Sequence, residues 1–209
     1  MLNLGLDLPT LVAYAIVLLI AFAVHEFAHA WTADMFGDDT PRINGRLTLN
    51  PLAHLDLMGS FMLLVAGFGW AKPVPVNFYA LERRSTAAPM WVALAGPISN
   101  FLMAVLAAIP FRLGLTSHLP HFFYQILDVF LTTNLVLMLF NLIPIFPLDG
   151  EKIATYAFPP FLARVLDQIR PYGPMILLLV IMLGQIGGMN LLGWILNPPL
   201  NSLIKILIG

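Results

Sequence analysis

Five long apolar stretches dominate the chain, and short segments rich in proline, glycine and charge separate them. A helix needs about 20 consecutive apolar residues to cross a membrane, and four of the stretches exceed that length. We therefore predict membrane-spanning helices. The stretches cover residues 10–36, 55–70, 87–111, 122–146 and 174–196.

Glycines interrupt the second and fifth stretches. Gly59, Gly67 and Gly69 punctuate residues 55–70, which predicts a short or re-entrant segment. In the fifth stretch we expect possible breaks at Gly184, Gly187 and Gly188. The apolar tail at residues 201–208 appears as a separate piece that is too short to cross a membrane alone.

These elements predict an all-α fold, a polytopic transmembrane helical bundle with about four to six membrane segments. A short re-entrant or β-like segment is expected near residues 70–80. We expect one integral membrane domain over residues 1–209, with a catalytic core at about 10–155. An amphipathic segment and a membrane segment would follow at about 156–209.

The composition excludes several classes of protein. Of the 209 residues, 59% are hydrophobic and 10% are charged, and the mean hydropathy is +0.87. Soluble domains carry about 25% charged residues, so the lipid bilayer must be part of the solvent. The net charge of −1 offers no basic surface for nucleic acid. The absence of cysteine excludes thiolate zinc sites and cysteine nucleophiles.

The basic residues predict the orientation. Most lie in loops that one topology places on a single side, and the positive-inside rule assigns that side to the cytosol. The start of the chain lacks the basic residues of a secretory signal, so we expect the first stretch to remain as a membrane anchor. The basic residues of the cytosolic side are Arg42, Arg46, Arg83, Arg84, Lys152, Arg164 and Arg170.

The first stretch contains the motif His25-Glu26-Phe27-Ala28-His29. Residues four apart share a helix face, so both imidazoles can bind one metal ion, and Glu26 is placed to activate a metal-bound water. The alternative is a pair of histidines that bond to backbone or water within the bundle. Ionisable groups in an apolar span are costly without compensation, and this favours a metal site.

Two histidines leave a catalytic zinc ion one protein ligand short. The best third ligand is Asp149, which follows the fourth stretch in the sequence Asn141-Leu-Ile-Pro-Ile-Phe-Pro-Leu-Asp149-Gly150. The first and fourth stretches are expected to run in the same direction, so the three side chains should lie at similar depth. Leu-Asp-Gly as a simple turn at the membrane surface is the alternative.

Together these motifs resemble the site-2 protease family of intramembrane zinc metallopeptidases. The resemblance covers about residues 10–155 in matching order. It implies one Zn²⁺ per chain, bound by His25, His29 and Asp149, with Glu26 as the catalytic base. Neither a PDZ nor a CBS segment is found, which implies a short form. The other matching motifs are Gly45-Arg46-Leu-Thr-Leu-Asn50-Pro51, Gly69-Trp-Ala-Lys72-Pro-Val-Pro-Val-Asn77 and Ala95-Gly96-Pro97.

The resemblance also implies that Asn141 contacts the substrate or stabilises the transition state. An extended segment at residues 72–77 would present the amides of Val74 and Val76 on one edge, where an unwound peptide can pair with them. Asn77 is a further candidate for substrate binding. A polyproline turn is the alternative for this segment.

The expected function is therefore zinc-dependent hydrolysis of peptide bonds in or near the transmembrane segments of other membrane proteins. We expect an integral, multi-pass protein of the cell membrane with its active site toward the cytosol, and transmembrane proteins or peptides as substrates. The alternatives are a membrane metal transporter and a catalytically inactive scaffold. The sequence does not indicate an oligomeric state.

Overall fold

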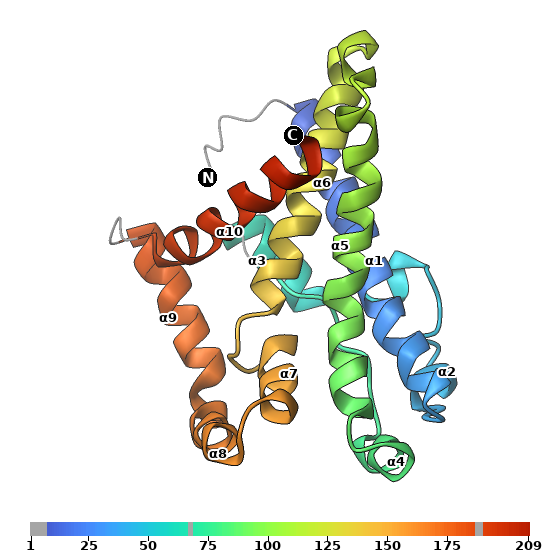
Figure 1. Cartoon of the computed structure of the whole chain (residues 1–209), viewed down its shortest axis with the longest axis vertical. Coiled ribbons are helices and arrows are strands. Elements are labelled where there is room, and N and C mark those ends of the chain that lie inside the picture. The colour runs from blue at the N-terminus through green and yellow to red at the C-terminus, as the bar shows by residue number, and fades with distance from the viewer. Residues whose placement is uncertain (1–7, 67–68, 187–189) are drawn as a thin grey trace.

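The computed structural model describes residues 8–66, 69–186 and 190–209, and every regular element within these ranges is a helix (Figure 1). The predicted all-α polytopic bundle is thus confirmed. Five stretches are long and apolar enough to cross a membrane, namely Ala13–Met35, Ala88–Arg112, His121–Asn141, Pro160–Gly184 and Leu191–Ile208.

Three helices form the centre of the bundle, α1 (Leu8–Met35), α5 (Ala88–Arg112) and α6 (His121–Asn141). Helix α5 runs antiparallel to both α1 and α6 (Figure 1). Small side chains allow this close packing, as is typical of membrane helices. Alanines of α5 pack against Leu131 and Leu135 of α6, and Ala21 of α1 is fully buried.

The C-terminal part differs from the prediction. The fifth stretch divides into α9 (Gly173–Ile186) and α10 (Leu191–Ile208). The tail at residues 201–208 is therefore not a separate short piece, because it continues α10, whose Leu200 packs against α5 and α6. Helix α9 runs through the predicted break point Gly184 and ends at Ile186, and α10 begins at Leu191. The predicted break points Gly187 and Gly188 lie outside the described residues.

The fourth stretch ends earlier than predicted. Helix α6 ends at Asn141 rather than near residue 146, and the irregular segment that follows contains Pro144 and Pro147. Proline lacks the amide that an α-helix needs in its interior. The chain re-enters a helix at Asp149, the first residue of α7 (Asp149–Ala157).

The re-entrant or β-like region is built from short elements. Helix α3 (Leu57–Ala66) has 10 residues and is about 15 Å long, which is half the hydrocarbon thickness. Among the described residues the β-type pairing is limited to an isolated bridge between Leu55 and Ala71, and residues 72–77 form no strand. The remaining short elements are α2 (Thr40–Ile43), η1 (Pro51–Ala53), α4 (Phe78–Arg84), η2 (Leu115–His118), α8 (Pro160–Ile169) and η3 (Arg170–Tyr172).

Candidate metal centre

The two histidines of the motif lie one turn apart on α1 and meet Asp149 from the start of α7. The Nε2 atoms of His25 and His29 are 3.0 Å apart. Oδ2 of Asp149 lies 3.1 Å from Nε2 of His25 and 3.3 Å from Nε2 of His29. The structure therefore brings the three predicted ligands together, with one ligand atom of each inside a 4.8 Å cluster.

Hydrogen bonds on the far side of each ring decide where its proton lies. Nδ1 of His29 is 2.7 Å from the carbonyl oxygen of Val92 and donates to it, because a carbonyl only accepts. Nδ1 of His25 is 2.6 Å from Oδ1 of Asn100. Both rings then carry their proton on Nδ1 and present the lone pair of Nε2 to the cluster.

A relay of two asparagines fixes the orientation of Asn100. The Asn134 amide donates to the carbonyl oxygen of Phe130 at 2.8 Å, and the Asn100 amide donates to Oδ1 of Asn134 at 2.9 Å. This leaves Oδ1 of Asn100 as the acceptor for His25. Both asparagines are 0% exposed, so water does not compete for these bonds.

The centre thus contains three converging acceptor atoms, two imidazole nitrogens and one carboxylate oxygen. Neutral histidines in these tautomers have no proton to share between them, so the lone pairs repel one another unless a cation lies among them. Imidazole nitrogen and carboxylate oxygen are the donor types that Zn²⁺ accepts. Hydrogen bonds on the far nitrogens are typical of histidines that bind metal. The residues present therefore fit a zinc ion.

Gly96 of α5 lies directly against the Nε2 atoms of His25 and His29. A Cβ atom at this position would overlap Nε2 of His29 and lie only 2.5 Å from Nε2 of His25. The rings are anchored through Nδ1 and have little room to move away. The glycine therefore keeps open the space that an ion and a reacting group need.

We expect Gly96→Ala to weaken zinc binding by at least about tenfold. Substitution of a residue that supports a metal ligand typically lowers metal affinity by about 10- to 100-fold, and we take the lower end of that range. The new methyl group would occupy the space beside both Nε2 atoms. The measurement is zinc affinity by competition with a chelator. Ile98→Val, an exposed change on the same helix, is the control, and unchanged affinity in Gly96→Ala would contradict the role of the glycine.

We expect Asn100→Leu to lower zinc affinity by about 10- to 100-fold, because His25 would lose the acceptor that holds its tautomer. It would also leave the Asn134 carbonyl oxygen buried without its donor, which costs about 1–3 kcal/mol of stability. Zinc titration and thermal unfolding measure the two effects. In the double variant Asn100→Leu/Asn134→Leu, stability should partly recover while zinc affinity stays low. If stability and zinc affinity both recovered, the two asparagines would contribute to stability alone and not to zinc binding.

The other predicted site residues are placed as follows. Glu26 is half-buried on α1, next to His25. The side-chain amide of Asn141 donates to the carbonyl oxygen of Leu137 in its own helix at 3.0 Å. Asn77 caps α4 through its side-chain oxygen, and its backbone amide donates to Asp38 at 2.7 Å. A role of Asn141 or Asn77 in substrate contact stays a prediction.

The extended segment is held by a buried arginine rather than by a sheet. The guanidinium of Arg46, 4% exposed, donates to the carbonyl oxygens of Lys72 at 2.5 Å and Pro73 at 2.6 Å. Among the described residues, the amides of Val74 and Val76 donate to no backbone acceptor. Pairing of this edge with a peptide stays a prediction.

The negative charge of Glu26 acts on the pKa of two basic residues, Arg46 and Lys152. Burial lowers the pKa of the Arg46 guanidinium, and the negative charge of Glu26 opposes that shift. Burial also lowers the pKa of Lys152, against the charges of Asp149, Glu151 and Glu26. The charge of Glu26 therefore acts both on the loop that contains Arg46 and on α7, which contains Lys152.

Sequence analysis missed Asn100 and Asn134, and it noted Gly96 only within the motif Ala95-Gly96-Pro97, without a place at the centre. Asn100 and Asn134 are uncharged polar residues within apolar stretches, and that signal alone points to a buried polar contact in a membrane helix. Gly96 gives no such signal, because glycine is common in membrane helices. Only its position opposite the imidazoles reveals its role.

Comparison with known proteins finds similarity to named bacterial proteins. The chain is 38% identical over 202 residues, 91% of this chain and 89% of the relative, to "Putative zinc metalloprotease YwhC" of Bacillus subtilis. It is 32% identical over 173 residues to "Putative zinc metalloprotease Rip2" of Mycolicibacterium smegmatis, covering 78% of this chain and 64% of the relative. For Rip2 of Mycobacterium tuberculosis the identity is 29% over 173 residues, 81% of this chain and 66% of the relative. No family model and no solved structure matches the chain.

Proposed function

The chain belongs to the family of zinc metalloproteases that YwhC and Rip2 represent, and from this premise we propose that it is an intramembrane endopeptidase of the site-2 protease class. It would hydrolyse peptide bonds in or near the transmembrane segments of other membrane proteins. The observation that carries the proposal is the convergence of His25, His29 and Asp149 on one point, with both histidines inside the candidate span Ala13–Met35.

His25, His29 and Asp149 would hold one Zn²⁺ through two nitrogens and one oxygen. A zinc ion held there would polarise the scissile carbonyl group and make water more acidic. The chain's own contribution is to fix the ligands before metal arrives. Val92 and Asn100 hold the two rings in the tautomer that leaves Nε2 free.

Glu26 would act as the general base. It lies next to His25 on α1 and is half-buried, so its carboxylate can take a proton from the attacking water and pass it to the leaving amine. Asn141 would donate a hydrogen bond to the transition state after its amide turns away from Leu137.

The substrate must be unwound, because a helix hides its carbonyl groups in its own hydrogen bonds. We expect substrates with glycine, proline or asparagine in the segment that is cleaved. The amides of Val74 and Val76, which donate to no backbone acceptor in the part of the chain that the structure describes, would hold the unwound peptide by strand pairing, with Asn77 nearby.

The chain would lie in the cell membrane with the metal centre toward the cytosol. Most of its basic residues lie at one end of the bundle, the end toward which α1 and α6 run. Water needed for hydrolysis would reach the centre from that side.

A paired assay on purified protein tests the function. In proteoliposomes that also contain a transmembrane reporter with a glycine–proline break, we expect cleavage that stops with a zinc chelator and returns with added zinc. Zinc uptake into protein-only vesicles is measured in parallel. Uptake without cleavage would indicate a metal transporter, and zinc binding without either activity would indicate an inactive scaffold.

A further inference from the structure

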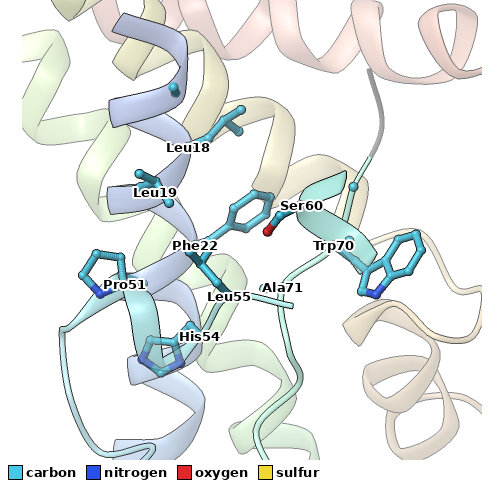
Figure 2. A pocket seen from close by; sticks show the side chains of 13 residues that line it. Leu18, Leu19, Phe22, Pro51, His54, Leu55, Ser60, Trp70 and Ala71 are labelled. Atoms are coloured by element: carbon cyan, nitrogen blue, oxygen red, sulfur yellow. The ribbon is translucent and has the colours of Figure 1, made fainter. Parts of the chain in front are cut away.

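Residues 72–77 are joined at their first end to the loop that precedes α3. The bridge between Leu55 and Ala71 lies directly before the segment, and Figure 2 shows these two residues side by side. The amide of Lys72 donates to the carbonyl oxygen of His54 at 2.8 Å. These backbone contacts give the first residue of the segment a fixed place.

Arg46 adds a side-chain anchor at the same end. Its buried guanidinium donates to the carbonyl oxygens of Ala53, Lys72 and Pro73. Among the described residues no carboxylate forms an ion pair with it. A buried charge is costly unless hydrogen bonds compensate it, and here three carbonyl groups from two segments do so. Arg46 therefore fastens the start of residues 72–77 to the loop.

Asp38 holds the last residue of the segment. Its side chain is 1% exposed, and its two oxygens have separate partners. Oδ2 accepts from the amide of Asn77 at 2.7 Å, and Oδ1 accepts from the amide of Thr40 at 3.0 Å. The backbone amide of Asp38 donates to the carbonyl oxygen of Ala33 in α1 at 3.0 Å. Asp38 therefore connects the end of the segment directly to α1.

Between the two anchors the segment is locally stiff. Pro73 and Pro75 fix their own φ angles and disfavour a helical conformation of the residue before each of them. In the part of the chain that the structure describes, the amides of Val74 and Val76 donate to no backbone acceptor. A stiff segment held at both ends presents these amides in one arrangement, so a peptide that pairs with them has little chain to order.

Two contacts relate the segment to the metal centre. Val76 packs against the buried cluster that contains Val92, and the carbonyl oxygen of Val92 accepts from Nδ1 of His29. Burial lowers the pKa of Arg46 and the negative charge of Glu26 opposes that shift, so Arg46 lies within electrostatic range of the proposed base. The anchors therefore set the place of the segment relative to the centre.

We propose that Arg46 and Asp38 are positioning residues for the substrate, a proposal that rests on the protease function. They hold the two ends of residues 72–77, so that the amides of Val74 and Val76 meet an unwound peptide in an arrangement already fixed relative to the metal centre. Each acts through the segment rather than on the reacting groups. Loss of either anchor should therefore weaken substrate binding and leave zinc affinity and the chemical step unchanged.

Asp38→Asn and Arg46→Lys each loosen one end of the segment. The single carbonyl oxygen of asparagine can serve the nearby Thr40 amide but not the Asn77 amide as well. Lysine keeps the charge but lacks the fork through which Arg46 binds carbonyl groups of two segments.

The substrate for both variants is a leucine–alanine transmembrane peptide of about 25 residues with a central glycine–proline pair. In each variant we expect its KM to rise about 5- to 30-fold, the factor for ordering one backbone residue, while kcat stays at the wild-type value. Asp39→Asn and Arg84→Lys make the same exchanges at exposed positions and should keep the wild-type KM. A matching loss of kcat and zinc affinity in the anchor variants would assign both residues to the fold and overturn the proposal.

A backbone exchange in the peptide tests whether the anchors act through pairing with the segment. An ester in place of one amide removes a donor and weakens an acceptor. Esters are placed in turn at each position beside the glycine–proline pair, and binding is measured to the Glu26→Gln protein, in which cleavage should be slow. At one position or more we expect about fivefold weaker binding, the effect of one net hydrogen bond. This penalty should shrink when Asp38→Asn or Arg46→Lys is added.

An ester penalty that is absent at every position, or that is equally large with and without the anchor substitutions, would overturn the proposal. The first of these measurements needs neither anchor variant, so it stays valid if both fail to fold. Cleavage by the wild type separates this proposal from the protease function. Peptides that are cut with an unchanged KM in both variants contradict the anchors alone. Peptides whose binding depends on Arg46 and Asp38 but that are never cut support the anchors and contradict the protease function.

Discussion

The Glu26→Gln protein should bind zinc as the wild type does and cleave its substrate about 10²- to 10⁴-fold more slowly, the range that general acid–base catalysis supplies. Glutamine has the same size as glutamate but does not accept the proton of the attacking water. The proposed ligand atoms belong to His25, His29 and Asp149, so the exchange should leave zinc binding unaffected.

Cleavage rate and zinc content of the same preparation measure this result. Asp128→Asn, the same exchange of carboxylate for amide on an exposed position of α6, is the control and should leave both unchanged. Cleavage at the wild-type rate in Glu26→Gln would remove Glu26 from the mechanism and favour another base. Loss of zinc would indicate that Glu26 is itself a ligand.

Asp149→Ala should lower zinc affinity by more than about 100-fold, beyond the 10- to 100-fold that is typical of residues that only support a ligand. Its carboxylate contacts both imidazoles, at 3.1 and 3.3 Å, and no other carboxylate of the described residues does so. Without it, two neutral nitrogens remain, and a catalytic zinc site ordinarily has three protein ligands. Cleavage should be lost with the metal.

Chelator competition measures the affinity, and thermal unfolding gives an independent readout. Added zinc should raise the unfolding temperature of the wild type, because a ligand that binds the folded state stabilises it. That shift should disappear in Asp149→Ala and remain in Asp39→Ala, a matched change at an exposed residue. A full zinc shift in Asp149→Ala would exclude Asp149 as a ligand.

The expected order of effects separates the parts of the centre. Asp149→Ala should remove the metal, whereas Gly96→Ala and Asn100→Leu should weaken its binding by smaller factors. Glu26→Gln should leave binding intact and remove the chemistry. A set of variants that all lost zinc to the same extent would indicate unfolding rather than distinct roles.

The local features of this protein were predictable because local spacing determines them. Apolar stretches longer than about 20 residues indicate membrane helices whatever lies beside them. The four-residue spacing of His25 and His29 places both rings on one helix face before any tertiary contact forms. Pro144 and Pro147 end a helix through the loss of backbone donors, although α6 ends still earlier, at Asn141.

The predictions from sequence were wrong where contacts between distant parts of the chain decide the structure. The tail at residues 201–208 looked too short to be a membrane segment, but it continues α10 and packs against α5 and α6. Residues 72–77 alternate like an edge strand, but the buried guanidinium of Arg46 binds two of their carbonyls and no sheet forms among the described residues. Neither contact is encoded in the local pattern.

The sequence by itself determined that the chain is a bundle of membrane helices, the range of their number, and the face of α1 on which His25 and His29 lie together. Only the tertiary structure decided how that face is completed. His25 contacts Asp149, which is 124 positions away in the sequence, and Asn100, which is 75 positions away. Gly96 leaves open the space beside the Nε2 atoms of His25 and His29. The reason is physical, because spacing along one helix is fixed by its 3.6-residue turn, whereas contacts between distant helices depend on which side chains their packing brings within bonding distance.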